Sequence, residues 1–227
     1  MIKIENIVLP SPEQWNSIIM GARNPMNSWD KSDSGCVDFE YWDCGHGIPD
    51  GNGNAFVIGE NDLGLMKRLR NAGTDHRKFM RMITVYVDIT APLYWWKEHD
   101  QHKVGTVTNS CSTMHKIHAK KFTLDDFSCE HLSEDVIEKP FKDIINCLNF
   151  FRGLYIQHYD KSDWYSMIQL LPSSYNQKRT VMLNYEVLAN MYKNRKGHKL
   201  DEWRDFCKWI ETLPYSEIIT GKFREEQ

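Results

Sequence analysis

The sequence contains no apolar run of the roughly 18 residues that a membrane-spanning helix needs. Its first ten residues, MIKIENIVLP, lack the cationic start and long apolar core of a secretory signal. Neither sign of charge is in large excess, since the formal net charge is -3, whereas a duplex-DNA binder normally carries a basic face. We therefore expect a cytoplasmic protein that binds neither a membrane nor a nucleic acid polymer.

The cysteines form no CxxC pair, which argues against the common zinc and redox motifs. Because no secretory signal is evident, we expect the six thiols to be reduced. Cys36, Cys44 and His46 are the best candidates for a zinc site, but their spacing matches no standard ligand pattern. We therefore predict no metal site.

Several catalytic motifs are also absent. The sequence has no GxGxxG, no P-loop and no HExxH, and nothing in it resembles a GxSxG nucleophile elbow. These absences argue against the nucleotide-binding and hydrolase classes that depend on these motifs, and no cysteine has the local signature of a catalytic nucleophile.

The chain has 227 residues, of which 41% are hydrophobic and 26% charged, as expected of a globular protein with a core. Without repeats or linkers, we predict a single domain over residues 1–227. Residues 24–61 are polar and rich in glycine, and we expect a long irregular insertion there. Loops of this length are usually functional or mobile.

Hydrophobic periodicity gives a mixed order of strands and helices. Strands are expected at 2–10, 82–90 and 179–185, and helices at 11–23, 61–73, 133–157, 162–172, 186–195 and 200–213. Residues 91–99 are expected to form a short helix or a turn. Ser11 and Gln14 form the pattern of a capping box, and Pro140 should kink or restart its helix. The order predicts an α/β (α+β) fold with a mixed central sheet flanked by helices.

Residues 104–121, VGTVTNSCSTMHKIHAKK, are expected to form a loop and have the chemistry of an anion site. Asn109, Ser110 and Ser112 supply hydrogen-bond donors, and His115 and Lys116 supply positive charge. The alternative is an ordinary polar surface loop.

Three further positions are candidates for ligand binding. Arg195 ends an apolar helical stripe formed by Leu188, Met191 and Tyr192, so its guanidinium either extends to solvent or faces a pocket and reads a planar ligand. Lys178 and Arg179 precede a strand and could meet a phosphate. His76 lies in a turn between a helix and a strand, where a structural role is the more common one.

Taken in order, these segments resemble the flavin-dependent thymidylate synthases. The resemblance rests on separate anchors between residues 15 and 205. They are GARNPMNSWD with Ser28, the block HRKFMRMITVYVDITAP beginning at His76, the segment TNSCSTMH, and Leu171-Pro172 followed at family spacing by Asn184, Leu188, Asn190 and Arg195. His198 comes next, one residue closer to Arg195 than in the family. The chain departs from the family where an Arg-His-Arg signature should precede Asn109. His102 and Lys103 are the nearest basic residues there, and Met114 replaces an arginine.

The resemblance implies a homotetrameric, ThyX-like enzyme that methylates dUMP to dTMP, with FAD as cofactor and methylenetetrahydrofolate and NADPH as co-substrates. Arg195 and His76 would be catalytic, and Arg195 would also hold the pyrimidine. The remaining substrate residues would be Asn109, Ser110, Ser112, Lys178 and Arg179. The residues around FAD would be Ser28, His76, Lys78, His102, Lys103, Asn184, Asn190 and His198.

Two alternatives remain open. The chain either modifies another pyrimidine nucleotide with the same flavin and folate chemistry, or it is a non-catalytic nucleotide-binding protein on the same fold. Because the family mechanism needs no protein thiolate, Cys111 is expected to be a small packing residue.

Overall fold

A computed structural model describes residues 1–38, 47–49 and 53–222. The contacts of the chain gather into two compact units. Unit 1 comprises residues 1–5, 88–101 and 108–180, and unit 2 comprises residues 6–87, 102–107 and 181–227. The expectation of a single domain stays a prediction.

A four-stranded sheet has the order β1-β5-β7-β6, and its strands run through both units. The strands are β1 (Lys3–Val8), β5 (Thr84–Pro92), β7 (Asn176–Asn184) and β6 (Val107–Ser110). Burial in β5 alternates from Val85 to Ile89, because successive side chains point to opposite faces of a sheet. The strands predicted at 2–10, 82–90 and 179–185 are confirmed.

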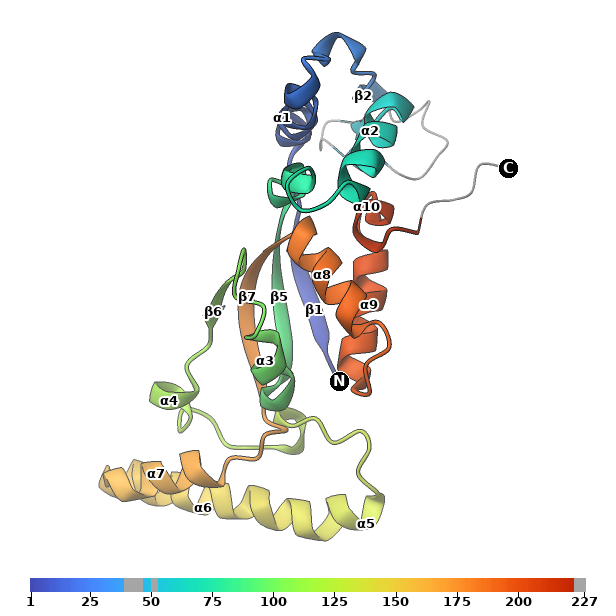
Figure 1. The fold of residues 1–227 in the computed structure, drawn as a ribbon. Helices are drawn as coiled ribbons and strands as arrows, with labels where there is room; N and C mark the ends of the chain where they lie inside the picture. Colours follow the sequence, from blue (N-terminus) through green and yellow to red (C-terminus); the bar gives the residue numbers. More distant parts are fainter. Residues whose placement is uncertain (39–46, 50–52, 223–227) are drawn as a thin grey trace. The chain divides into compact units, whose positions relative to one another are not determined.

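Unit 2 carries most of the helices that hold the candidate ligand residues (Figure 1). They are α1 (Pro12–Arg23), α2 (Glu60–Asn71), α8 (Tyr185–Arg195), α9 (Asp201–Glu211) and α10 (Ser216–Thr220), with the 3-10 helices η1 (Asn24–Met26), η2 (Trp29–Lys31) and η4 (Arg77–Arg81). Ser11 caps α1 in the predicted capping box, since its backbone N–H donates to Gln14 Oε1 over 2.8 Å. Trp15, fully buried, packs edge-on against Tyr185 and Tyr215.

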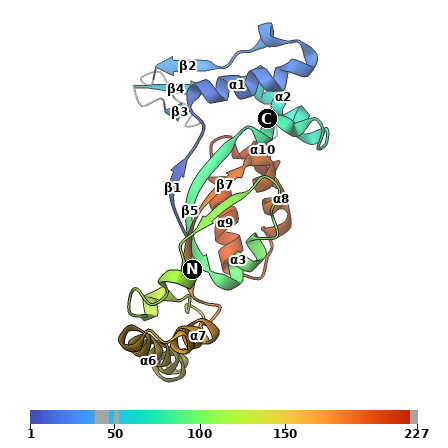
Figure 2. The ribbon, with the colours of Figure 1, turned by 90° about the vertical axis from the view of Figure 1, so that its left-hand side faces the viewer.

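Residues 24–61, for which irregular backbone was expected, contain short regular elements as well as loop in their described part. Besides η1 and η2, this segment contains a second sheet of order β2-β4-β3, visible beside α1 in Figure 2. The strands β2 (Gly35–Asp38), β3 (Ile48–Pro49) and β4 (Asn54–Val57) pair antiparallel, with Cys36 opposite Phe56. These strands are too short for a period-two pattern to stand out from the polar residues around them.

Unit 1 contains a helical hairpin built on its own apolar core (Figure 1). The long helix predicted at 133–157 is α5 (Glu134–Val136), a π-helical segment η6 (Ile137–Phe141) and α6 (Lys142–His158). Pro140 lies inside the π-helical segment, which confirms that it interrupts the regular helix. Next comes α7 (Lys161–Leu170), which lies against α6, and the residues buried in this core are Ile117, Phe122, Phe127, Phe141, Ile145, Leu148 and Met167.

The segment 104–121 is more ordered than a loop. It forms β6 and then α4 (Thr113–Lys116), and unit 1 also holds α3 (Leu93–His99) and η5 (Leu124–Asp126). The strand arises because the backbone of this segment pairs along β7, where the N–H of Cys111 donates to the carbonyl of Lys178 over 2.9 Å. Its side chains give no periodic signal because most of them are exposed.

The predicted fold class is confirmed: the chain is a mixed α+β protein with antiparallel strand pairs and helices. Within the described residues, no helix is long and apolar enough to span a bilayer. Cys36, Cys111, Cys129, Cys147 and Cys207 have free thiols. Cys44 and His46, from the candidate zinc set, lie outside the described residues, and those described contain no group of metal-binding side chains.

Candidate functional site

Helix α8 begins at a cap that ties it to the segment before β6. Asn184 accepts a hydrogen bond from the N–H of Val187 over 3.0 Å and donates to the carbonyl of Gly105 over 3.3 Å. Gly105 has a φ of +79°, and a Cβ there would lie 2.8 Å from Nδ2 of Asn184. Only glycine combines a positive φ with the absence of a Cβ that would collide with Asn184. The contact therefore fixes the backbone that carries His102 and Lys103.

The other end of α8 presents Arg195 above an aromatic ring. The stripe of Leu188, Met191 and Tyr192 is buried as predicted, and the guanidinium that follows it lies 4.9 Å from the ring centre of Trp203. Trp203 is fully buried in α9, so it is a rigid platform. An arginine held in this way keeps its plane fixed, which suits it to recognising a planar ligand.

Two histidines converge on the same tryptophan. The ring of His102 lies 6.1 Å from that of Trp203, and the ring of His198 lies 6.3 Å from it. His198 is held in place because its Nδ1 accepts a hydrogen bond from the N–H of Leu200 over 3.2 Å. The structure therefore brings together His102, Arg195 and His198, three residues that the resemblance placed at the substrate and FAD.

The electrostatics of His102 differ from those of an exposed histidine. Burial lowers its pKa from the ordinary value of 6.5, and the positive charge of Arg195 lowers the pKa further. Nε2 of His102 and Oγ1 of Thr106 are buried, and neither has a hydrogen-bond partner among the described residues. Buried polar atoms normally have partners, so these two suit the polar groups of a ligand.

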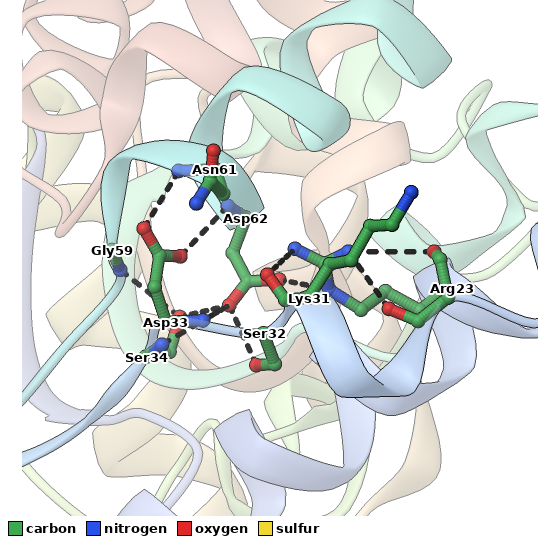
Figure 3. Close-up of polar contacts among 9 residues, drawn as sticks. Arg23, Lys31, Ser32, Asp33, Ser34, Gly59, Asn61 and Asp62 are labelled. Atoms are coloured by element: carbon green, nitrogen blue, oxygen red, sulfur yellow. Dashed lines mark hydrogen bonds and ion pairs between the residues drawn. The ribbon is translucent and has the colours of Figure 1, made fainter.

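Arg23 and Asp62 form a buried ion pair (Figure 3), and Arg23 also contacts Ser28. Nε of Arg23 donates to Oδ1 of Asp62 over 2.5 Å, while its Nη1 donates to the carbonyl of Ser28 over 3.0 Å and to its hydroxyl over 3.3 Å. The other oxygen of Asp62 accepts from the hydroxyls of Ser32, over 2.7 Å, and Ser34, over 2.6 Å. These contacts hold the loop that carries Ser28 against the N-terminus of α2.

His76 and Lys78 are exposed and lie at the start of η4. That element is tied to α8, because Nε of Arg77 donates to Glu186 over 3.0 Å and Arg81 donates to the same carboxylate. Lys103 and Asn190 are also exposed. No contact among the described residues joins these four side chains into one site.

The predicted anion-binding side chains of residues 109–112 lie in unit 1 and are exposed. Asn109 and Ser110 end β6. The hydroxyl of Ser112 accepts a hydrogen bond from the N–H of His115 over 2.9 Å and so caps α4. Its O–H remains a donor, so the cap leaves a phosphate interaction open.

Lys178 and Arg179 are adjacent on β7, so their side chains point to opposite faces of the sheet. Lys178 pairs with Asp88 over 2.9 Å, and this hydrogen bond raises the pKa of Lys178. Arg179 pairs with Asp100 over 2.8 Å and lies 4.2 Å above the ring centre of Trp96. Both cations already have carboxylate partners, and one ligand cannot reach both from the same face.

Several features of the site were not predicted from the sequence. Cys111, expected to pack, is exposed, because only its backbone is engaged: Gln177 donates to its carbonyl over 3.1 Å. Trp203, Gly105 and Asp62 were missed because each acts through a partner distant in the chain. The only local signal was the position of Trp203 on an amphipathic helix, which by itself indicates burial.

The fold of the chain is similar to that of two solved structures. Two crystal structures of the flavin-dependent thymidylate synthase ThyX from Helicobacter pylori, each with FAD and dUMP, are both 18% identical to this chain. One match has a TM-score of 0.60 and covers 96% of this chain and 95% of the other, and the second has a TM-score of 0.62 and covers 99% of each. No protein-family model and no curated protein matches the chain. The ThyX-like fold expected from the sequence is confirmed over nearly the whole chain.

Proposed function

We propose that this chain is a flavin-dependent thymidylate synthase that methylates dUMP to dTMP, with FAD as cofactor and methylenetetrahydrofolate and NADPH as co-substrates. The fold shared with the Helicobacter pylori enzyme supports the class of activity. The observation that carries the proposal is the convergence of His102, Arg195 and His198 on the buried ring of Trp203.

The residues of unit 2 fit an FAD molecule. The orphaned Nε2 of His102 and Oγ1 of Thr106 need polar partners, which a ligand with phosphate, ribose and ring heteroatoms offers. FAD would be held by Ser28, His76, Lys78, His102, Lys103, Asn184, Asn190 and His198. When bound, FAD supplies the reducing equivalents that turn the transferred carbon into a methyl group.

Arg195 would read the pyrimidine. The planar fork of a guanidinium matches two neighbouring acceptors on a ring edge, and stacking on Trp203 fixes the orientation of the fork before the ligand arrives. The same positive charge would stabilise the negative charge that develops on the pyrimidine when its C5 attacks the carbon donor. His76 is the second catalytic candidate, and it would line the FAD.

The nucleotide phosphate would be bound by Asn109, Ser110 and Ser112 together with Lys178 or Arg179. Exposed donors at the end of a strand suit an anion, and either cation would have to exchange its carboxylate for the phosphate. We propose a homotetramer in which subunits share sites, as in the family that the sequence resembles. The phosphate residues and Arg195 need not then come from the same copy.

A specific observation favours a second candidate, the modification of another pyrimidine nucleotide. Lys178 and Arg179 are paired with Asp88 and Asp100, and Met114 stands where the family has an arginine. Fewer available cations imply a changed mode of phosphate recognition, so the family's choice of dUMP need not carry over to this chain.

The test is product formation by the purified protein with FAD, NADPH and methylenetetrahydrofolate, comparing dUMP, dCMP and UMP by mass spectrometry of the nucleotides. The proposal predicts a mass gain of one methyl group on dUMP. Methylation of dCMP or UMP alone would establish the second candidate. No methylation of any of the three by FAD-loaded protein would mean a non-catalytic nucleotide-binding protein.

A further inference from the structure

A small concave pocket lies in unit 1, and its lining includes Met114 and His115, which follow the proposed phosphate segment 109–112 but are not part of it. It has a volume of about 290 Å³ and is lined by Met114, His115, Tyr155, Tyr159, Lys161 and Trp164. This volume is close to the lower end of the range for small-molecule sites, roughly 300–1,000 Å³. The pocket therefore has the size for one small ligand.

The walls of the pocket are aromatic, and protein contacts hold them in place. Nε1 of Trp164 donates to the carbonyl of Met114 over 2.8 Å, which joins α7 to α4. The ring of Tyr155 lies 4.9 Å from that of His118 on one side and 5.8 Å from that of Tyr159 on the other. These contacts fix the indole and Tyr155, so ring faces are available before a ligand binds.

Tyr159 is 75% exposed, although it is a large aromatic residue. It ends α6 in the left-handed conformation, with φ of 54°, and its N–H donates to the carbonyl of Tyr155 over 2.7 Å. A non-glycine residue in this region costs some conformational energy. The helix end therefore presents the Tyr159 ring at the mouth of the pocket rather than burying it in the core.

The side chains that line the pocket include a lysine and a histidine but no carboxylate. Lys161 begins α7, and its ammonium lies 5.4 Å from the ring centre of Tyr165; within the described parts of the chain it makes no ion pair. His115 follows the cap of α4 and lies on the same lining. A cation and an imidazole beside three aromatic rings complement a flat ring that bears a negative charge.

We propose that this pocket binds a planar aromatic ring carrying an anionic group, the chemistry of a mononucleotide. The ring would stack on Tyr159 and Trp164, and the anion would meet Lys161 and His115. The lining shares no residue with those proposed to bind dUMP or FAD, and dUMP is kept saturating in the test so that the neighbouring phosphate segment 109–112 is occupied. It also gives a role to His115, which follows the hydroxyl-rich residues of the anion-binding sequence pattern.

The test uses adenosine 5′-monophosphate as the probe, because a purine separates this pocket from a pyrimidine site. Binding is measured by calorimetry on the full chain saturated with FAD and dUMP. We expect binding of the probe, with adenosine and inorganic phosphate each binding more weakly. Lys161→Gln should weaken binding roughly 10- to 150-fold through the lost charge-assisted contact. Tyr159→Ala should weaken it roughly 5- to 150-fold through the lost stacking.

Two matched variants serve as controls. Lys142→Gln removes an exposed lysine of α6 that pairs with Glu138, and Phe150→Ala removes a 60% exposed ring of the same helix. Neither residue lines the pocket, so both variants should bind the probe like the wild type. Absence of heat with the wild type, or equal affinity in Lys161→Gln, would overturn the proposal. So would a lower oligomeric state in Tyr159→Ala, measured by light scattering, since the face would then be covered by a second copy.

Discussion

The guanidinium of Arg195, at the end of α8, lies 4.9 Å from the ring centre of Trp203 in α9. A cation over an indole gains about 0.5–2 kcal/mol, with the larger values for desolvated pairs. Trp203 is fully buried, so this contact orients the planar fork before any ligand binds. An Arg195→Lys variant would keep the positive charge but would lose the planar guanidinium group.

Substitution of Arg195 should therefore change nucleotide binding without changing the fold. Arg195→Lys should weaken dUMP binding by about 1.5–3 kcal/mol, or roughly 10- to 150-fold, and Arg195→Ala should weaken it further. Calorimetry on FAD-loaded protein checks this. Arg152→Lys is the control, because Arg152 lies on α6 and donates to the carbonyl of His118, which belongs to no proposed dUMP or FAD site. Equal affinity in Arg195→Ala and the wild type would show that Arg195 is not the pyrimidine reader.

Gly105 and Gly153 should respond oppositely to alanine. At Gly105, a Cβ meets Asn184 at 2.8 Å with φ at +79°, so Gly105→Ala should lower the free energy of unfolding by about 1–3 kcal/mol. At Gly153, inside α6, a Cβ meets nothing within 4 Å, so Gly153→Ala should raise it by about 0.5–1 kcal/mol. Urea unfolding measures both. Equal effects would mean that the contact between Gly105 and Asn184 does not constrain the backbone.

The pair of Arg23 and Asp62 should be a major source of stability in unit 2. Breaking a buried ion pair by removing one partner costs about 3–5 kcal/mol, because the other charge stays buried. Asp62→Asn should show this loss, whereas Asp205→Asn, which removes an exposed partner of Lys208, should cost about 1 kcal/mol or less. Urea unfolding of the two variants compares them directly. A small loss in Asp62→Asn would mean that the serine hydroxyls and amides hold the loop on their own.

Asp62 should also contribute to acid sensitivity. Burial raises its pKa, but hydrogen bonds from Ser34, Ser32 and Arg23 outweigh burial, and the net pKa lies below the ordinary value of 3.8. A carboxyl with a lowered folded pKa contributes stability that is complete above its unfolded pKa and is lost as the pH falls through the folded value. The wild type should lose more stability than Asp62→Asn below about pH 4. If the free energy of unfolding of the two proteins fell equally as the pH was lowered, the prediction would be contradicted.

His102 should give a separate pH dependence. Burial and then the charge of Arg195 lower its pKa below 6.5, so the unfolded chain binds more protons near that pH than the folded chain does. Stability is therefore complete above the unfolded value and decreases as the pH falls from about 6.5 toward the folded pKa. Urea unfolding of His102→Gln should show a shallower decrease over this window. If the free energy of unfolding of His102→Gln fell with pH as steeply as that of the wild type, a group other than His102 would cause the pH dependence.

Cys111 should be dispensable, although it is exposed beside Ser112. Its carbonyl and N–H contact Gln177 and Lys178 of β7, and Cys111→Ala keeps both hydrogen bonds. Because the proposed chemistry needs no protein thiolate, the variant should retain most of its rate of dTMP formation. A loss of about 10³-fold or more would indicate covalent catalysis by the thiol.

The sequence predicted the elements whose signals are local. The capping box of Ser11 and Gln14, the buried alternation in β5 and the apolar stripe leading to Arg195 all follow from periodicity and capping. The fold was predicted from the resemblance, through anchors spread along the chain, and the structural matches confirm it.

Other features depend on residues distant in the chain, where no periodicity operates. The sheet of β2, β4 and β3 has strands too short to show alternation, and β6 forms because its backbone pairs with β7. Lys178 and Arg179 look equivalent in the sequence, but their strand sends them to opposite faces, toward Asp88 and Asp100. The platform of Trp203 beneath Arg195 appears only once α8 and α9 are packed together.

The proposed activity is tested most directly by a dUMP titration of FAD-loaded protein, followed through the absorption spectrum of the flavin, in the wild type and in Arg195→Ala. We expect a homotetramer that binds FAD noncovalently, a saturable spectral change with dUMP in the wild type, and a much weaker response in the variant. A flavin-free protein after incubation with excess FAD, or identical dUMP titrations for the two proteins, would contradict the proposed activity.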